Sequence, residues 1–132
     1  MSNQYQSLID AFGTCGFHEK AALPTLAVCP YDWRKDNALA AHLLAIKVAE
    51  MYERHGSDLV LNLVAHSMGG LVCRYFLESG QFSQASHPGF ASVRRLITIG
   101  TPHRGAPSAQ EGRAFVAKHG RRSGPPSMTS VR

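Results

Sequence analysis

The segment that most constrains the fold is a short apolar run that meets a Ser-Gly turn and is followed at once by a second apolar run. The first run, Leu59 to Ala65, has the length and composition of a buried strand, and the second, Leu71 to Leu77, that of a helix. Residues 66–70 between them read H-S-M-G-G. A strand, a tight turn and a helix in immediate succession predict a parallel sheet with crossover helices.

The rest of the first hundred residues also alternates helical and strand-like patterns. We expect a short helix over Gln4 to Phe12, a buried strand over Thr25 to Cys29 and a third strand over Val93 to Ile99. The longest helix is expected between an N-cap at Asp36 and a stop at Gly56. Its apolar positions, all expected in the core, are Leu39, Leu43, Leu44, Ile46, Val48 and Met51. This order indicates the α/β class.

Length and composition fit one globular domain. The chain has 132 residues, of which 44% are hydrophobic, and no apolar run approaches the length of a membrane span. Its first ten residues lack the pattern of a secretion signal, so a cytoplasmic location is the default expectation. Cys15, Cys29 and Cys73 are widely spaced, which favours free thiols over a disulfide framework or a zinc site. We therefore expect neither a metal nor a cofactor.

The net charge of +5 is unevenly distributed. Before residue 94 acidic side chains slightly outnumber Lys and Arg, whereas from Arg94 onward Glu111 is the single acid among many basic residues. This basic stretch contains one aromatic residue, Phe115, and is rich in Gly, Ser and Pro. We interpret residues 108–132 as a solvated, disordered basic tail, not as a nucleic-acid-binding surface.

Residues 65–69 contain the candidate reactive side chain of the sequence, the hydroxyl of Ser67. They read A-H-S-M-G, a small residue two positions before a serine and another two positions after it. Small residues at Ala65 and Gly69 allow a strand and a helix to approach closely around Ser67, whose hydroxyl then stands exposed above the sheet. The same turn aims the N–H of Met68 and the helix N-terminus at a developing oxyanion.

Three segments in this order resemble the lecithin:cholesterol acyltransferase-like group of α/β-hydrolases. They read P-Y-D-W-R at residues 30–34, A-H-S-M-G-G-L-V at 65–72 and I-T-I-G-T-P-H-R-G-A-P at 97–107. The resemblance covers roughly Leu8 to Pro107. It implies an α/β-hydrolase fold with a nucleophile elbow, of which residues 1–107 would form the central part.

The resemblance also implies a function. Ser67 would be the nucleophile that accepts an acyl group, and Met68 would supply an oxyanion-hole N–H. The substrate would be a lipid or another ester, which leaves room for transient contact with a membrane surface.

The partners that Ser67 would need are missing from the expected places. In this fold an acid and then a histidine follow the nucleophile, yet no Asp follows Ser67. Glu78 would lie far down the helix that starts at the turn, and Glu111 with His119 falls in the basic stretch. We therefore expect an incomplete α/β-hydrolase, a fragment. Two interpretations stay open: a serine acyltransferase or lipase, and a non-catalytic remnant that keeps the turn as a compact unit.

Other conspicuous side chains have structural explanations. His66 is interpreted as a side chain of the turn, and His103 as a loop-positioning residue that follows the third strand too early to be the base. Asp32 and Arg34 are expected to form an ion pair in a strand-end turn packed by its aromatics. Cys73, one turn past the serine on an apolar helix, is expected to be a buried thiol.

Overall fold

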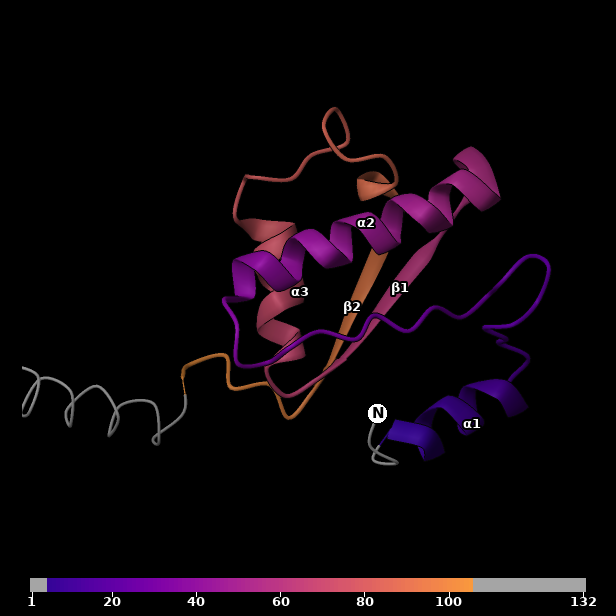
Figure 1. Ribbon diagram of the computed structural model, residues 1–132, viewed down its shortest axis with the longest axis horizontal. Helices are drawn as coiled ribbons and strands as arrows, with labels where there is room; N and C mark the ends of the chain where they lie inside the picture. Colours follow the sequence, from indigo (N-terminus) through magenta and orange to yellow (C-terminus); the bar gives the residue numbers. More distant parts are fainter. Residues whose placement is uncertain (1–4, 106–132) are drawn as a thin grey trace, which may run out of the picture. The chain divides into compact units, whose positions relative to one another are not determined.

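Two helices are followed by a strand, a helix and a second strand in the part of the chain that the structure, a computed structural model, describes, residues 5–105 (Figure 1). The elements are α1 (Gln6–Thr14), α2 (Asn37–His55), β1 (Leu61–His66), α3 (Gly69–Glu78) and β2 (Val93–Ile99), with 3₁₀ turns η2 (Gly56–Asp58) and η3 (Phe90–Ser92). They lie in the first of two units, Met1–Thr101. In the second, Pro102–Arg132, residues 102–105 are described, and the Gly105 N–H donates to the Pro102 carbonyl at 3.0 Å.

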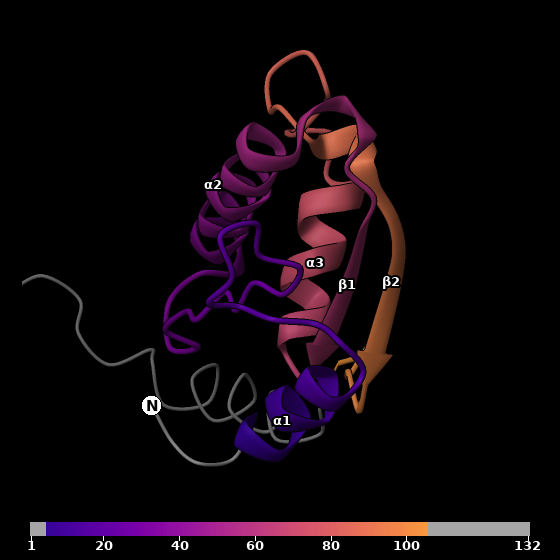
Figure 2. The same ribbon diagram turned by 90° about the vertical axis from the view of Figure 1, so that its right-hand side faces the viewer.

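The sheet has two parallel strands, β1 and β2, joined through α3. Leu63 pairs with Leu96 and His66 with Ile99, after a register irregularity next to Leu61. Helices α2 and α3 lie on the same face of this sheet (Figure 2). The prediction of an α/β architecture with a parallel sheet is confirmed for the described residues.

The core lies between α2, α3 and the inward face of the sheet. Its centre is Phe76, which is completely buried, with Phe82 and Phe90 at ring-centroid distances of 5.1 Å. The other buried residues of the cluster are Ala40, Ala41, Leu44, Ala45, Val48, Ala65, Val72 and Cys73. Burying these side chains against one another is the main term that holds α3, and the turn before it, in place.

Local signals at both ends define α2, and the helix has the predicted bounds. The carboxylate of Asp36 accepts a hydrogen bond from the Ala38 N–H at 2.8 Å, which is N-cap geometry. At the other end Gly56 adopts φ +73°, a conformation that costs glycine little and ends the helix.

The strand predicted over Thr25 to Cys29 is wrong. This segment has no regular secondary structure, and its first two N–H groups, those of Thr25 and Leu26, both donate to the His18 carbonyl. A strand requires a neighbour to form a ladder, and within residues 5–105 β1 and β2 pair only with each other. The apolar, β-prone composition of this segment is therefore not enough to make it a strand, because no neighbouring strand pairs with it.

The predicted core stripe of α2 is only half buried. Leu44, Val48 and Met51 are buried as expected, whereas Leu39, Leu43 and Ile46 are exposed, by 49%, 43% and 57% respectively. Leu44 and Val48 belong to the core cluster that α2 shares with α3, whereas the exposed set lies outside that cluster.

Strand β1 also differs from the expected buried type. Side chains alternate along β1, so Ala65 is buried and Val64 faces outward. Val64, Ile97 and Ile99 are exposed because the face of the sheet to which they point is opposite to α2 and α3.

Some predictions fall on residues that the structure does not describe. Glu111, His119 and the basic stretch 108–132 lie outside residues 5–105. Within the described part, no helix combines the length and the apolar character needed to cross a membrane.

Candidate functional site

Ser67 occupies the turn between β1 and α3 in a strained backbone conformation. Its φ is +52°, and within residues 5–105 no other residue except glycine has a positive φ. The Ser67 N–H donates to the carbonyl of Ile99 at 2.8 Å, which extends the parallel ladder by one residue and ties the turn to the end of β2. The serine is exposed. Strain of this kind persists only where the surroundings enforce it, and it is typical of functional turns.

The first turn of α3 leaves two N–H groups open beside Ser67. The Gly70 N–H donates to the Ser67 carbonyl at 3.2 Å and the Leu71 N–H to the Met68 carbonyl at 3.0 Å. No acceptor among residues 5–105 takes the N–H of Met68 or of Gly69. Unpaired N–H groups at a helix N-terminus favour a negative charge in front of them.

Small side chains pack the turn as the sequence pattern predicts, with one addition that the pattern missed. Ala65 is buried, and a Cβ on Gly69 would lie 3.7 Å from the Ala65 Cβ and 3.6 Å from the Tyr31 Oη, which is ordinary contact. A Cβ on Gly70, in contrast, would overlap the side chain of Thr101, with Cγ2 at 2.7 Å and Cβ at 2.8 Å. The sequence feature that could have indicated this contact is Gly70, the second of two consecutive glycines.

The P-Y-D-W-R segment reaches the turn through its tyrosine. Tyr31 is half-buried against the core, and burial, with a smaller effect of the neighbouring Tyr5, raises the pKa of its phenol. Arg34 donates to both carboxylate oxygens of Asp32 at 2.9 Å, and these hydrogen bonds lower the Asp32 pKa. The predicted ion pair is confirmed. The expectation that the aromatics pack this turn is wrong for Trp33, which is 69% exposed because its side chain points away from the core.

The histidines near the motifs have different surroundings. His66 is exposed, on the face of β1 opposite to Ala65, and its Nδ1 lies 3.3 Å from the Tyr5 hydroxyl. His103 is exposed and belongs to the second unit.

Glu78, the acid that follows Ser67 within the described chain, forms an ion pair away from the serine. Glu78 is the last residue of α3 and pairs with Arg74 one turn earlier, at 2.6 Å. This agrees with its predicted place, at the far end of the helix from the serine. Cys73 is buried as predicted, and desolvation raises its pKa to about 11, which leaves a thiol with little thiolate character at neutral pH.

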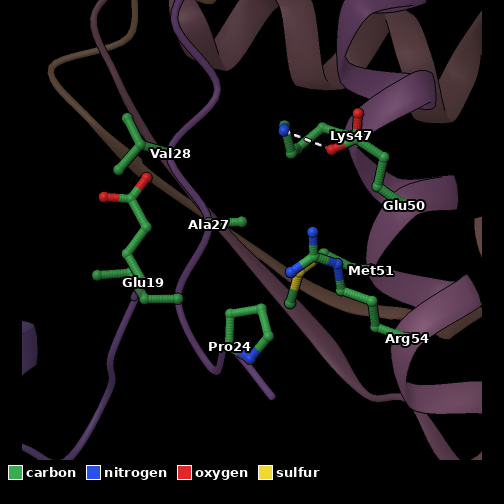
Figure 3. Close-up of a pocket in the computed structure, with 9 residues that line it drawn as sticks. Glu19, Pro24, Ala27, Val28, Lys47, Glu50, Met51 and Arg54 are labelled. Atoms are coloured by element: carbon green, nitrogen blue, oxygen red, sulfur yellow. Dashed lines mark hydrogen bonds and ion pairs between the residues drawn. The ribbon is translucent and has the colours of Figure 1, made fainter. Parts of the chain in front are cut away.

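A pocket of about 150 Å³ lies away from Ser67, between the 19–28 segment and α2 (Figure 3). Four charged residues contribute to its lining, Glu19, Lys47, Glu50 and Arg54, and Lys47 forms an ion pair with Glu50. Among residues 5–105 no group of three or more His, Cys, Asp or Glu side chains could hold a metal ion.

Comparison with known proteins decides the family. The family model of lecithin:cholesterol acyltransferase matches residues 1–130. The chain belongs to this family. It is 36% identical to the bovine lysosomal phospholipase A and acyltransferase over 81 residues, which are 59% of this chain and 18% of that protein.

Two further family relatives extend the comparison. The chain is 32% identical to the phospholipase A(1) LCAT3 of Arabidopsis thaliana over 107 residues, 78% of this chain and 22% of that protein. It is 37% identical to the human lysosomal phospholipase A and acyltransferase over 76 residues, 55% of this chain and 17% of that protein.

The chain thus spans about a fifth of the length of these family relatives. No solved structure matches it. The names of these relatives lend no support to the cytoplasmic location expected from the sequence.

Proposed function

We propose that Ser67 is the acyl-accepting nucleophile of a serine-dependent phospholipase or O-acyltransferase site that acts on lipid esters. The observation that carries this proposal is the positive φ of Ser67 at an exposed strand-to-helix turn, directly before two open N–H groups. That is the arrangement a nucleophile elbow requires. Membership of the acyltransferase family supports the same reaction class.

The proposed chemistry has two steps. Ser67 Oγ attacks the carbonyl carbon of the ester while a general base takes its proton, and the N–H of Met68 stabilises the oxyanion. The C–O bond to the alcohol then breaks, the alcohol leaves with that proton, and an acyl group remains on Ser67. Water or an acceptor alcohol attacks this acyl-enzyme and gives its proton to the base. The bond between the acyl group and Ser67 Oγ then breaks, the base returns the proton to Oγ, and the fatty acid or a new ester is released.

The proposal places the site in an α/β-hydrolase fold of which residues 1–107 are the central part, followed by a basic tail over 108–132. The acid that orients the general base would lie outside residues 5–105, since Glu78 is the sole acid of the described chain after Ser67 and pairs with Arg74 at the far end of α3. Glu111 and His119 keep the required order of acid and base in this chain. The proposed partner is a lipid or ester substrate met at a membrane surface, with no nucleic acid and no cofactor.

One observation favours a second candidate, a non-catalytic remnant of such an enzyme. Glu78 is bound to Arg74 at the far end of α3, so the described residues supply no acid for a catalytic triad. In that case the turn persists because it joins β1 to α3 compactly.

Incubation of the 132-residue chain with a short-chain p-nitrophenyl ester separates the two candidates. We expect a burst of nitrophenol and an acyl adduct on Ser67 by peptide mass spectrometry, both lost in Ser67→Ala. Ser79→Ala, which removes an exposed serine at the other end of α3, serves as the matched control and should keep both. Equal turnover by the wild-type protein and Ser67→Ala would favour the remnant.

A further inference from the structure

We infer that Thr101 is a positioning residue for Ser67: its side chain, set against the Cβ-free Gly70, holds the first turn of α3 on the end of β2. The consequence for catalysis rests on the proposed function. The packing role itself does not.

Two contacts connect the end of β2 to the turn, one on each side of the serine Cα. On the N-terminal side, the Ile99 carbonyl accepts the Ser67 N–H at 2.8 Å. On the C-terminal side, two residues further along the chain from Ile99, Thr101 occupies the space that a Cβ on Gly70 would fill. Gly70 in turn donates its N–H to the Ser67 carbonyl. The Ser67 N–H is therefore held by Ile99 directly, and the Ser67 carbonyl is held by Gly70, which packs against Thr101.

The side chain acts here through its shape. Thr101 Oγ1 is buried and has no hydrogen-bond partner among residues 5–105, so the hydroxyl adds no bond that would explain its place. A β-branched side chain has few rotamers and makes a stiff spacer. Valine has the same branched shape without the hydroxyl, whereas alanine removes the two branch atoms that lie against Gly70.

Loss of the spacer should relax the turn. Gly70 would move into the space left by a smaller residue at 101, and the strained φ of Ser67, which no local preference supports, would drift towards ordinary values. The side chain at position 67 would then lose its alignment with the open N–H groups of Met68 and Gly69.

The test replaces the serine by a thiol, whose ionisation reports this alignment without any need for a catalytic base. In the Ser67→Cys protein, the pKa of the introduced thiol is read from the pH dependence of its alkylation, with the modified residue distinguished from Cys15, Cys29 and Cys73 by fragmentation of the peptides in tandem mass spectrometry. A helix N-terminus lowers a thiol pKa from its usual value of about 8.5, commonly by one unit or more. We expect Thr101→Ala to raise the pKa of the introduced thiol by roughly one unit and Thr101→Val to leave it unchanged.

Equal pKa values of the introduced thiol in the alanine and valine variants would overturn the proposal, whatever their absolute value. A failure of the proposed function is distinguishable from this outcome. It would appear as a lack of ester turnover by the protein with Ser67, whereas the pKa difference between the alanine and valine variants of the Ser67→Cys protein would remain.

A second pair of variants tests the contact if Thr101→Ala fails to fold. Gly70→Ala should lower the thermal midpoint markedly, and Thr101→Gly in the same chain should recover much of the loss by removing the atoms with which the new methyl collides. Gly69→Ala is the matched control and should fold normally, since its methyl meets only ordinary contacts. Additive losses in the double variant would contradict a direct Gly70–Thr101 contact.

Discussion

Two side chains six residues apart, Ser67 and Cys73, lie in opposite environments. Ser67 is exposed in a strained turn at the N-terminus of α3, beside open N–H groups. Cys73 lies further along the same helix, buried in the core, where desolvation raises its pKa to about 11. Thiols are intrinsically the stronger nucleophiles, so under the proposed function the environment would reverse the order expected from chemistry alone.

Cys73 should therefore resist alkylation in the folded protein. At about pH 8 a pKa near 11 leaves about one thiol in a thousand as thiolate, and the exposed Cys15 should react far faster with iodoacetamide. Peptide mass spectrometry measures both rates, and unfolding in guanidinium should make them similar. Equal rates in the native protein would show that Cys73 is not buried.

The same pKa shift gives stability a pH dependence. Because folding raises the thiol pKa, the folded state binds this proton more tightly than the unfolded state does. The contribution of Cys73 is complete below about pH 9 and is lost as the pH rises through about 11. Denaturant titrations at several pH values should show this alkaline loss diminished in Cys73→Ala.

At the scale of elements, α2 shows how signals at the ends of a helix let the sequence locate it. Asp36 and Gly56 bound α2 in the sequence and in the structure alike, because a cap and a left-handed glycine act within a few residues. The segment Thr25 to Cys29 had strand composition, yet a ladder depends on a distant partner that no local pattern reveals. The contact of Thr101 with Gly70 was missed for the same reason, since it joins two segments that are 31 residues apart.

Removal of the α2 cap should have a measurable cost. Asp36→Ala leaves the Ala38 N–H without its acceptor, and we expect a loss of about 1 kcal/mol in the free energy of unfolding. Asp58→Ala, which removes an exposed carboxylate without a described hydrogen bond, controls for the change of charge and should stay within about 0.5 kcal/mol of the wild-type value. Chemical denaturation measures both. Equal losses would mean that Asp36 does not cap the helix.

Truncation of the central aromatic of α3 should cost much more. Phe76 is completely buried between Phe82 and Phe90, and Phe76→Ala is expected to destabilise the protein by about 3–5 kcal/mol. Phe17→Ala, at an exposed phenylalanine, is the control and should cost far less. Similar losses in the free energy of unfolding for the two variants would contradict a core centred on Phe76.

At the scale of the whole molecule, the described part leaves two apolar surfaces exposed. One is the outer stripe of α2, formed by Leu39, Leu43 and Ile46, and the other is the sheet face formed by Val64, Ile97 and Ile99. The sequence pattern predicted the α2 stripe and the strand that contains Val64 as buried, because periodicity identifies apolar positions but cannot show which layers of the fold are present to cover them. The chain spans about a fifth of its relatives' length, which agrees with a sheet that has covering helices on one face only.

These surfaces should make the 132-residue chain associate with itself. Ile46→Lys and Ile97→Lys each place a charge on one surface, and we expect less self-association in sedimentation velocity without a large loss of thermal stability. Ser57→Lys adds the same charge at an exposed polar position of η2, outside both surfaces, and serves as the control. A wild-type chain that stays monomeric at all concentrations would contradict the prediction.

The central claim, that Ser67 is a nucleophile, is tested most directly with a fluorophosphonate probe, which forms a covalent bond only with an activated serine. The purified 132-residue chain is labelled, and the modified residue is identified by peptide mass spectrometry, with Ser67→Ala and Ser79→Ala in parallel. We predict a label on Ser67 that disappears in Ser67→Ala and persists in Ser79→Ala. An unlabelled protein that circular dichroism shows to be folded, or a label that survives in Ser67→Ala, would contradict the claim.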